Sequence, residues 1–77
     1  MSGEKFLRYC VEKLVDDSSS IQIEEIQKDD GKIIYEIRVA QPDVARLIGR
    51  EGRTCKSLRT LLTLLHADTD VDIDAIS

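Results

Sequence analysis

Residues 49–52 read Gly-Arg-Glu-Gly and separate a short apolar run, residues 44–48, from a leucine-rich stretch, residues 53–65. Two glycines three positions apart, followed at once by a helical pattern, predict a sharp turn of the backbone. Because glycine has no Cβ, it adopts positive φ and lets a ligand come close to the main chain. The helix that follows directs its unpaired N–H groups and the positive end of its dipole at the same point. This arrangement favours an anionic ligand such as a phosphate.

The charge distribution favours the same interpretation. A net charge of −4 over 77 residues at first disfavours a nucleic acid partner. However, residues 44–66 contain five basic side chains and one acidic one and carry +4, whereas the remainder carries −8. Contacts to phosphate act within about a Debye length, ~8–10 Å, so the local concentration of charge decides what binds. The basic charge of this chain surrounds the glycine turn.

The length predicts a single small domain over residues 1–77. No apolar run approaches membrane-spanning length, and charged residues interrupt the stretch 6–15, which disfavours a signal peptide. We therefore expect a cytoplasmic protein that does not bind membranes. Cys10 and Cys55 lie among apolar neighbours and are predicted to be buried thiols, because a disulfide scaffold or a zinc site needs more ligands. We expect no metal and no cofactor.

Hydrophobic periodicity predicts six elements in the order helix, strand, strand, helix, helix, strand. The helices are expected over residues 4–16, 43–48 and 53–66, and the strands over residues 21–27, 32–40 and 70–75. Asp29, Asp30 and Gly31 predict the hairpin turn between the first two strands. Ile26 falls out of phase with the first strand and suggests a bulge there.

Several side chains are predicted to be buried. Apolar residues at helical spacing form the expected buried stripe of the last helix: Cys55, Leu58, Leu61, Leu62 and Leu65. Tyr9 and Tyr35 are expected to pack in the core with their hydroxyl groups at its rim. The acidic run over residues 68–74 superficially resembles a calcium loop, but Ile73 occupies the position that requires glycine. We therefore interpret this run as a strand with an acidic outer face.

The element order, together with residues 47–53, closely resembles the KH domain of the prokaryotic type (type II). The length, the strand segment 35–39, and Pro42 and Asp43 before the second helix make it similar to the small bacterial KhpA family, over residues 6–76. The resemblance implies an α+β fold of order α-β-β-α-α-β, with a three-stranded mixed sheet and three helices packed on one face. In KH domains the GxxG loop, here residues 49–52, clamps about four single-stranded nucleotides. The alternative is that the two glycines form only a corner between helices.

The resemblance also implies roles for individual residues. Gly49 and Gly52 would let the sugar–phosphate backbone approach, and Arg50 would pair with a phosphate. The remaining residues implied in RNA binding are Arg46, Ile48, Glu51, Arg53 and Lys56. Among these, Ile48, with Val44 or Cys55, would form an apolar floor for bases. Glu51 departs from the common pattern, because many KH loops carry a neutral or basic residue at this position. Its acidic side chain is expected to repel phosphate slightly.

The implied function is binding of short single-stranded RNA, as a post-transcriptional regulator or RNA chaperone. The implied partners are a second copy of the chain or a larger KH-containing protein of the Jag (KhpB) type. The alternative function is a protein-interaction or dimerisation module with little RNA binding of its own. Catalysis is not expected, because the single histidine, His66, lies at a helix end, where it is expected to cap carbonyl groups.

Overall fold

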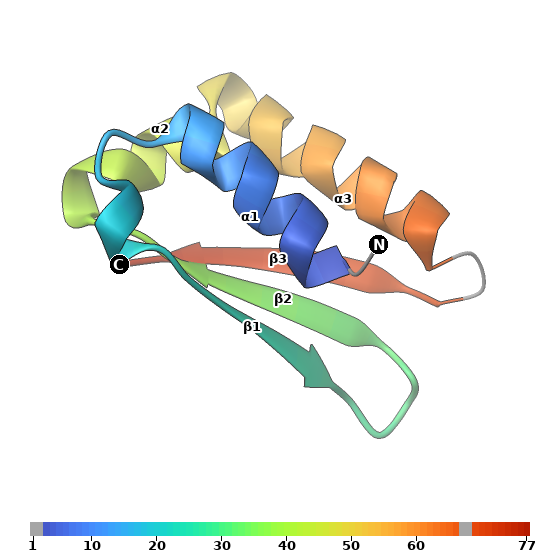
Figure 1. The fold of residues 1–77 in the computed structure, drawn as a ribbon. Coiled ribbons are helices and arrows are strands. Elements are labelled where there is room, and N and C mark those ends of the chain that lie inside the picture. The colour runs from blue at the N-terminus through green and yellow to red at the C-terminus, as the bar shows by residue number, and fades with distance from the viewer. Residues whose placement is uncertain (1–2, 67–68) are drawn as a thin grey trace.

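The computed structural model describes residues 3–66 and 69–77 and contains three α-helices and one three-stranded sheet. Helix α1 (Gly3–Leu14) precedes strands β1 (Gln22–Gln27) and β2 (Ile33–Arg38). Helices α2 (Val44–Ile48) and α3 (Arg53–Leu65) then lead to strand β3 (Val71–Ile76). All three helices lie on one face of the sheet (Figure 1). The predicted α+β fold of order α-β-β-α-α-β is therefore confirmed.

The sheet is mixed, with β2 in the centre. Strand β1 pairs with β2 antiparallel, and β3 pairs with β2 parallel. The hairpin turn lies where Asp29, Asp30 and Gly31 predicted it, with Gly31 at φ 88°. The pairing of β1 with β2 is unbroken, and Ile26 lies opposite Ile34 on the outer face of the sheet. The predicted bulge at Ile26 is therefore wrong, because this side chain finds an apolar partner across the strands instead.

The core lies between the sheet and the helices. Its fully buried side chains come from every layer and are Leu7, Val11, Tyr35, Ile37, Leu47 and Leu62. Leu58 and Leu62 are the members of the α3 stripe that face the sheet. Leu61 and Leu65 are 44% and 49% exposed, so their predicted burial is wrong. They lie on the flank of α3 beside the buried stripe, which neither the sheet nor α1 covers.

The two tyrosines differ in their environments. Tyr35 is buried as predicted, and its hydroxyl donates to Glu25 Oε1 at 2.5 Å. Since that bond uses the only hydroxyl proton, His66 Nε2, 2.8 Å away, donates to the tyrosine oxygen. His66 thus bonds Tyr35, where the sequence suggested a cap for helix carbonyls. Tyr9 is 63% exposed, with Lys13 Nζ 5.1 Å above its ring, so its predicted core position is wrong.

A buried carboxylate fixes the position of α2. Asp43 is 2% exposed and accepts from the backbone N–H groups of Asp16 and Asp17, each at 3.1 Å. These bonds connect the chain just after α1 to the residue directly before α2. The free-energy cost of burying a charged acceptor is offset when it accepts from two donors that would otherwise be unpaired. Asp43 therefore holds α2, and the glycine loop at its end, against the rest of the domain.

Candidate nucleic-acid interface

The glycine loop joins α2 to α3 through a backbone that rarely suits other residues. Gly49 ends α2 at φ 79°, and its N–H donates to Ala45 O at 2.9 Å. Residues Arg50–Gly52 form a single 3-10 turn in which Glu51 has φ 56° and Gly52 has φ 73°. Three of the four loop residues thus have positive φ. Glu51 is the one without glycine's freedom, and a non-glycine residue in this region is strained by roughly 1–2 kcal/mol.

Glycine is required at positions 49 and 52 for different structural reasons. A Cβ added to Gly49 would lie 2.8 Å from Thr54 Cβ and 3.0 Å from Thr54 N, closer than packing allows. A Cβ added to Gly52 would meet no atom within 4 Å. Gly49 is therefore required by both its φ and its neighbour, whereas Gly52 is required by φ alone. The free space beside Gly52 lies where a ligand can approach the backbone.

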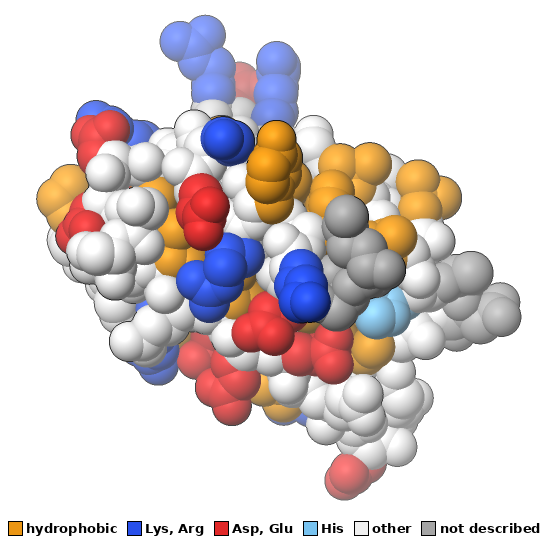
Figure 2. All heavy atoms as spheres, viewed as in Figure 1, with side chains coloured by type: hydrophobic (Ala, Val, Ile, Leu, Met, Phe, Trp, Pro, Cys, Tyr) orange, Lys and Arg blue, Asp and Glu red, His pale blue; other side chains and the backbone are white. Residues whose placement is uncertain are grey.

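Helix α3 begins directly after the loop, and Gly52 is its N-cap residue. Because Gly52 has no side chain, it forms no side-chain hydrogen bond to the N–H groups of the first turn. Arg50, Arg53 and Lys56 are all exposed around this end of the helix. Basic side chains stand over the start of α3 in Figure 2. Arg53 Nη2 lies 3.2 Å from Glu51 Oε2, and both side chains are at least 70% exposed. Such an exposed pair contributes about 0–1 kcal/mol and is easily exchanged for a phosphate contact.

Two predicted site residues lie at the edge of this surface. Ile48 is 37% exposed, directly before Gly49, and presents an apolar side chain beside the loop. Arg46 forms an ion pair with Asp16, and its Nη1 lies 4.0 Å from Asp43. The structure therefore brings Arg50, Arg53 and Lys56 together around the loop, while it directs Arg46 toward the carboxylates that anchor α2.

A shallow groove of about 90 Å³ continues from the loop between α3 and β3. Cys55, Lys56, Arg59, Asp72 and Ile73 line it. Arg59 Nη1 lies 3.9 Å from Asp72 Oδ1 across this groove. The sequence placed Arg59 only among the five basic side chains of residues 44–66. It missed Asp72 and Ile73, because nothing local predicts which strand residues meet α3.

The thiols do not add reactivity to this surface. Both cysteines are partly buried, and burial raises the pKa of the Cys10 and Cys55 thiols above the ordinary value. Cys55 Sγ donates to Leu47 O at 3.6 Å and connects α3 to α2. Among residues 3–66 and 69–77, no three His, Cys, Asp or Glu side chains are grouped to hold a metal ion.

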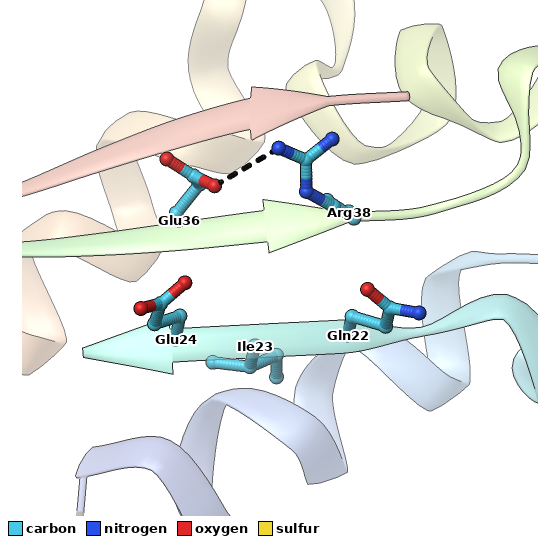
Figure 3. Close-up of a pocket in the computed structure, with 5 residues that line it drawn as sticks. All are labelled: Gln22, Ile23, Glu24, Glu36 and Arg38. Atoms are coloured by element: carbon cyan, nitrogen blue, oxygen red, sulfur yellow. Dashed lines mark hydrogen bonds and ion pairs between the residues drawn. The ribbon is translucent and has the colours of Figure 1, made fainter. Parts of the chain in front are cut away.

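The outer face of the sheet is acidic. Register places Glu24, Glu36 and Asp74 side by side across the strands. Figure 3 shows Glu36 joined to Arg38, with an Nη2 to Oε1 distance of 3.3 Å, beside Gln22 and Glu24 on the neighbouring strand. Carboxylates in such a row repel an approaching polyanion. The face of the molecule away from the helices therefore disfavours nucleic acid.

A second exposed surface is apolar. Leu64 is 71% exposed and, with Leu61 and Leu65, gives α3 an uncovered apolar side. Apolar side chains gather over the C-terminal half of α3 in Figure 2. A wide hollow of about 370 Å³ between α1 and α3 adjoins this helix and is lined by Tyr9, Cys10, Lys13, Leu14, Thr54, Ser57 and Leu58. Exposed apolar side chains that gather on one helix are typical of protein contacts.

The helices of the described part of the chain are too short or too polar to cross a bilayer. Comparison with known families matches residues 4–74 to the model of the KhpA/KhpB KH domain. The RNA-binding protein KhpA of Chlamydia pneumoniae is 41% identical over 70 residues, which cover 91% of this chain and 88% of the relative. The protein of the same name from Chlamydia caviae is 43% identical over 68 residues, 88% of this chain and 86% of the relative. The one from Leifsonia xyli is 36% identical over 91% of each chain.

Proposed function

Because the chain belongs to the KhpA/KhpB KH-domain family, we propose that it binds short single-stranded RNA by clamping the phosphate backbone at residues 49–52. The observation that carries this proposal is the loop backbone itself. Positive φ at Gly49, Glu51 and Gly52 turns the chain so that the uncapped start of α3 and exposed basic side chains share one surface. That surface suits a chain of phosphates.

Each loop residue has a distinct part in this proposal. Gly52 leaves open space for the sugar–phosphate backbone, and Gly49 sets the turn against Thr54. Arg50 pairs with a phosphate, while Arg53 and Lys56 extend the contact along α3. Ile48 provides an apolar floor for a base. Glu51 weakens binding through like-charge repulsion, and Arg46 acts mainly through its ion pairs with the anchor of α2.

The charge distribution supports one orientation of the bound RNA. The acidic row on the outer sheet face repels phosphate, so the strand lies along α3 rather than across the sheet. We propose binding without catalysis, in the cytoplasm, where single-stranded RNA is available. The biological role that fits is post-transcriptional regulation or RNA chaperoning, consistent with relatives named RNA-binding proteins.

The direct test replaces the charge of the loop. A labelled single-stranded RNA is titrated with the natural chain and with the double variant Arg50→Asp/Glu51→Asp, after circular dichroism confirms that both fold. Lys28→Asp in the hairpin changes the net charge equally and is the matched control. We expect the loop variant to lose binding and the control to retain it. Equal binding by all three proteins would contradict the proposal.

A second candidate function is self-association, favoured by the uncovered leucines of α3. We propose that Leu61, Leu64 and Leu65 contact a second copy of the chain, or the KH domain of a larger Jag (KhpB) type partner. A paired assembly would present two RNA loops and gain affinity by linkage. Analytical ultracentrifugation of the natural chain should show a dimer that Leu64→Lys abolishes and that Thr63→Lys, at an exposed position on another side of the same helix, preserves. A natural chain that stays monomeric up to high concentration would exclude the homodimer.

A further inference from the structure

Asp72 is a carboxylate in a groove otherwise suited to an anion. It lies on β3 at the free edge of the sheet, beside α3, where its side chain is 44% exposed. Its Oδ1 accepts from Ile73 N at 2.9 Å and lies 3.9 Å from Arg59 Nη1. Its Oδ2 lies 3.7 Å from Lys32 Nζ. The carboxylate is thus held in place by a backbone donor and by two cations that flank it.

The hydrogen bond from Ile73 N–H to Asp72 Oδ1 uses a backbone donor at the free edge of the sheet. Strand β3 is an edge strand. The carbonyl of Asp70, directly before β3, accepts from Ile33 N, and that of Ile76, the last residue of β3, accepts from Val39 N. Backbone groups alternate along a strand, so those of Ile73 point to the free edge. The outward N–H of Ile73 is occupied by Asp72. At this point the groove therefore offers the Asp72 carboxylate as acceptor, with Arg59 and Lys56 as the adjacent donors.

The basic side chains of α3 bring RNA to this point. Arg53, Lys56 and Arg59 recur every third residue, which is about 4.5 Å of helix rise per step. Arg59 lies about 9 Å along the helix axis from Arg53, so a backbone clamped at the loop and tracked by these cations passes beside the groove. Phosphates are attracted to the cations and repelled by Asp72. A nucleobase, rather than a phosphate, is therefore the part of the RNA that faces the carboxylate.

We infer that Asp72 is a specificity-determining residue that selects guanine at one nucleotide beside the loop, an inference that rests on the proposed RNA binding. The Watson–Crick edge of guanine presents two adjacent N–H donors beside the O6 acceptor. A carboxylate accepts both donors, and Arg59 donates to O6. Adenine and cytosine present one amino group next to an acceptor, and uracil presents one N–H between two carbonyls. These bases leave a lone pair of Asp72 facing another acceptor.

The test is fluorescence anisotropy with labelled hexauridine RNAs in which one guanosine is moved through each position. Inosine, which lacks the 2-amino donor, then replaces guanosine at the best position. The natural chain is compared with Asp72→Asn, which keeps the side chain's size, and with Asp74→Asn. Asp74 is the next residue of β3 on the same outer face, and it does not line the groove, so it matches the change in charge. Thermal melts establish that both variants fold.

The expected result is a preference of roughly tenfold for guanosine over uridine at one position. Replacing guanosine by inosine should lower this preference several-fold. Asp72→Asn should reduce the preference for guanosine to within twofold, and Asp74→Asn should leave that preference unchanged. Binding without a guanosine preference, or equal effects of both variants on every RNA, would overturn this inference while leaving the proposed function intact. Failure of the natural chain to bind any of these RNAs would overturn the proposed function and this inference with it.

Discussion

Gly49 packs against the first turn of α3 so closely that a Cβ on it would lie 2.8 Å from the Cβ of Thr54. The same glycine has φ 79° and ψ 172°, a conformation that is essentially restricted to glycine. Close packing and backbone conformation therefore demand glycine at the same position. Together they fix the angle at which α3 leaves the loop and hence where its uncapped N–H groups point.

Substitution of the two loop glycines should have unequal effects on stability. Gly49→Ala adds contact with Thr54 to backbone strain and should lower the free energy of unfolding by roughly 2–5 kcal/mol. Gly52→Ala adds only strain and should lower it by roughly 1–2 kcal/mol. Urea denaturation of both variants measures the difference. A Cβ on Gly49 would also meet Thr54 Oγ1, which Thr54→Ala removes, so adding Thr54→Ala should recover part of the loss in Gly49→Ala and none of the loss in Gly52→Ala. Identical losses would mean that the contact with Thr54 has no energetic weight.

Glu51 is expected to reduce both stability and RNA affinity. Its φ of 56° is strained for a side chain with a Cβ. Glu51→Gly relieves that strain and, after the greater entropy of glycine in the unfolded chain is counted, should stabilise the fold by roughly 0.5–1 kcal/mol. Glu51→Gln keeps the strain and removes only the charge. Both variants should bind RNA a few-fold more tightly at low salt, while thermal melts should show stabilisation only for glycine. Stabilisation of similar size in both would assign the effect to charge.

Asp43 is expected to be a stabilising residue outside the RNA surface. Asp43→Ala leaves the N–H groups of Asp16 and Asp17 without their acceptor and should lower the free energy of unfolding by roughly 2–3 kcal/mol or more. Asp43→Asn keeps one acceptor oxygen and should lose less. Urea denaturation provides the measurement, and Asp74→Asn, at an exposed position, serves as the control with little effect. A loss for Asp43→Ala no larger than that of the control would remove Asp43 from the account of how α2 is held.

The raised pKa of Tyr35 predicts that the folded protein loses stability at alkaline pH. Burial, followed by the hydrogen bond to Glu25, raises the pKa of Tyr35 well above its ordinary value. The folded state therefore holds the phenolic proton more tightly than the unfolded state. This contribution is complete below the ordinary tyrosine pKa of about 10 and is lost progressively as pH rises above it. Urea denaturation between about pH 8 and 11, compared for the natural chain and Tyr35→Phe, measures the effect. The comparison with Tyr35→Phe is needed because lysine side chains also titrate near the upper end of this range.

The phenylalanine variant should be less stable at neutral pH, because Glu25 and His66 lose their shared partner. Its stability should then fall less steeply than that of the natural chain as pH rises. RNA affinity at neutral pH should be unchanged, since Tyr35 lies in the core and away from the loop. Parallel pH profiles for the two proteins would contradict the assignment to Tyr35.

Local sequence patterns predicted the elements and the loop because the information lies in neighbouring residues. Alternation defines the strands, and Gly49 with Gly52 defines the turn. Helical periodicity could not decide which flank of α3 the sheet covers, so Leu61 and Leu65 were assigned to the wrong side. The predicted core position of Tyr9 on α1 was wrong for the same reason, because the residues that decide its burial come from distant parts of the chain.

The contacts that tune the site could not be predicted from the sequence. Asp16 and Arg46 are thirty positions apart and meet only because Asp43 brings the end of α1 to α2. Asp72 and Arg59 meet only because β3 returns parallel to β2 beneath α3. Such pairs depend on the tertiary fold. The sequence therefore indicated the class of ligand through the loop, while the groove required the structure.

The central claim, that phosphates bind at the loop, is tested most directly by the salt dependence of RNA affinity. If Arg50, Arg53 and Lys56 each neutralise one phosphate, the logarithm of the association constant should fall against the logarithm of salt concentration with a slope of about −2. Arg50→Gln should reduce the slope by about 0.7, and Lys28→Gln in the hairpin should leave it unchanged. A slope near zero, or one that Arg50→Gln does not alter, would contradict phosphate clamping at residues 49–52.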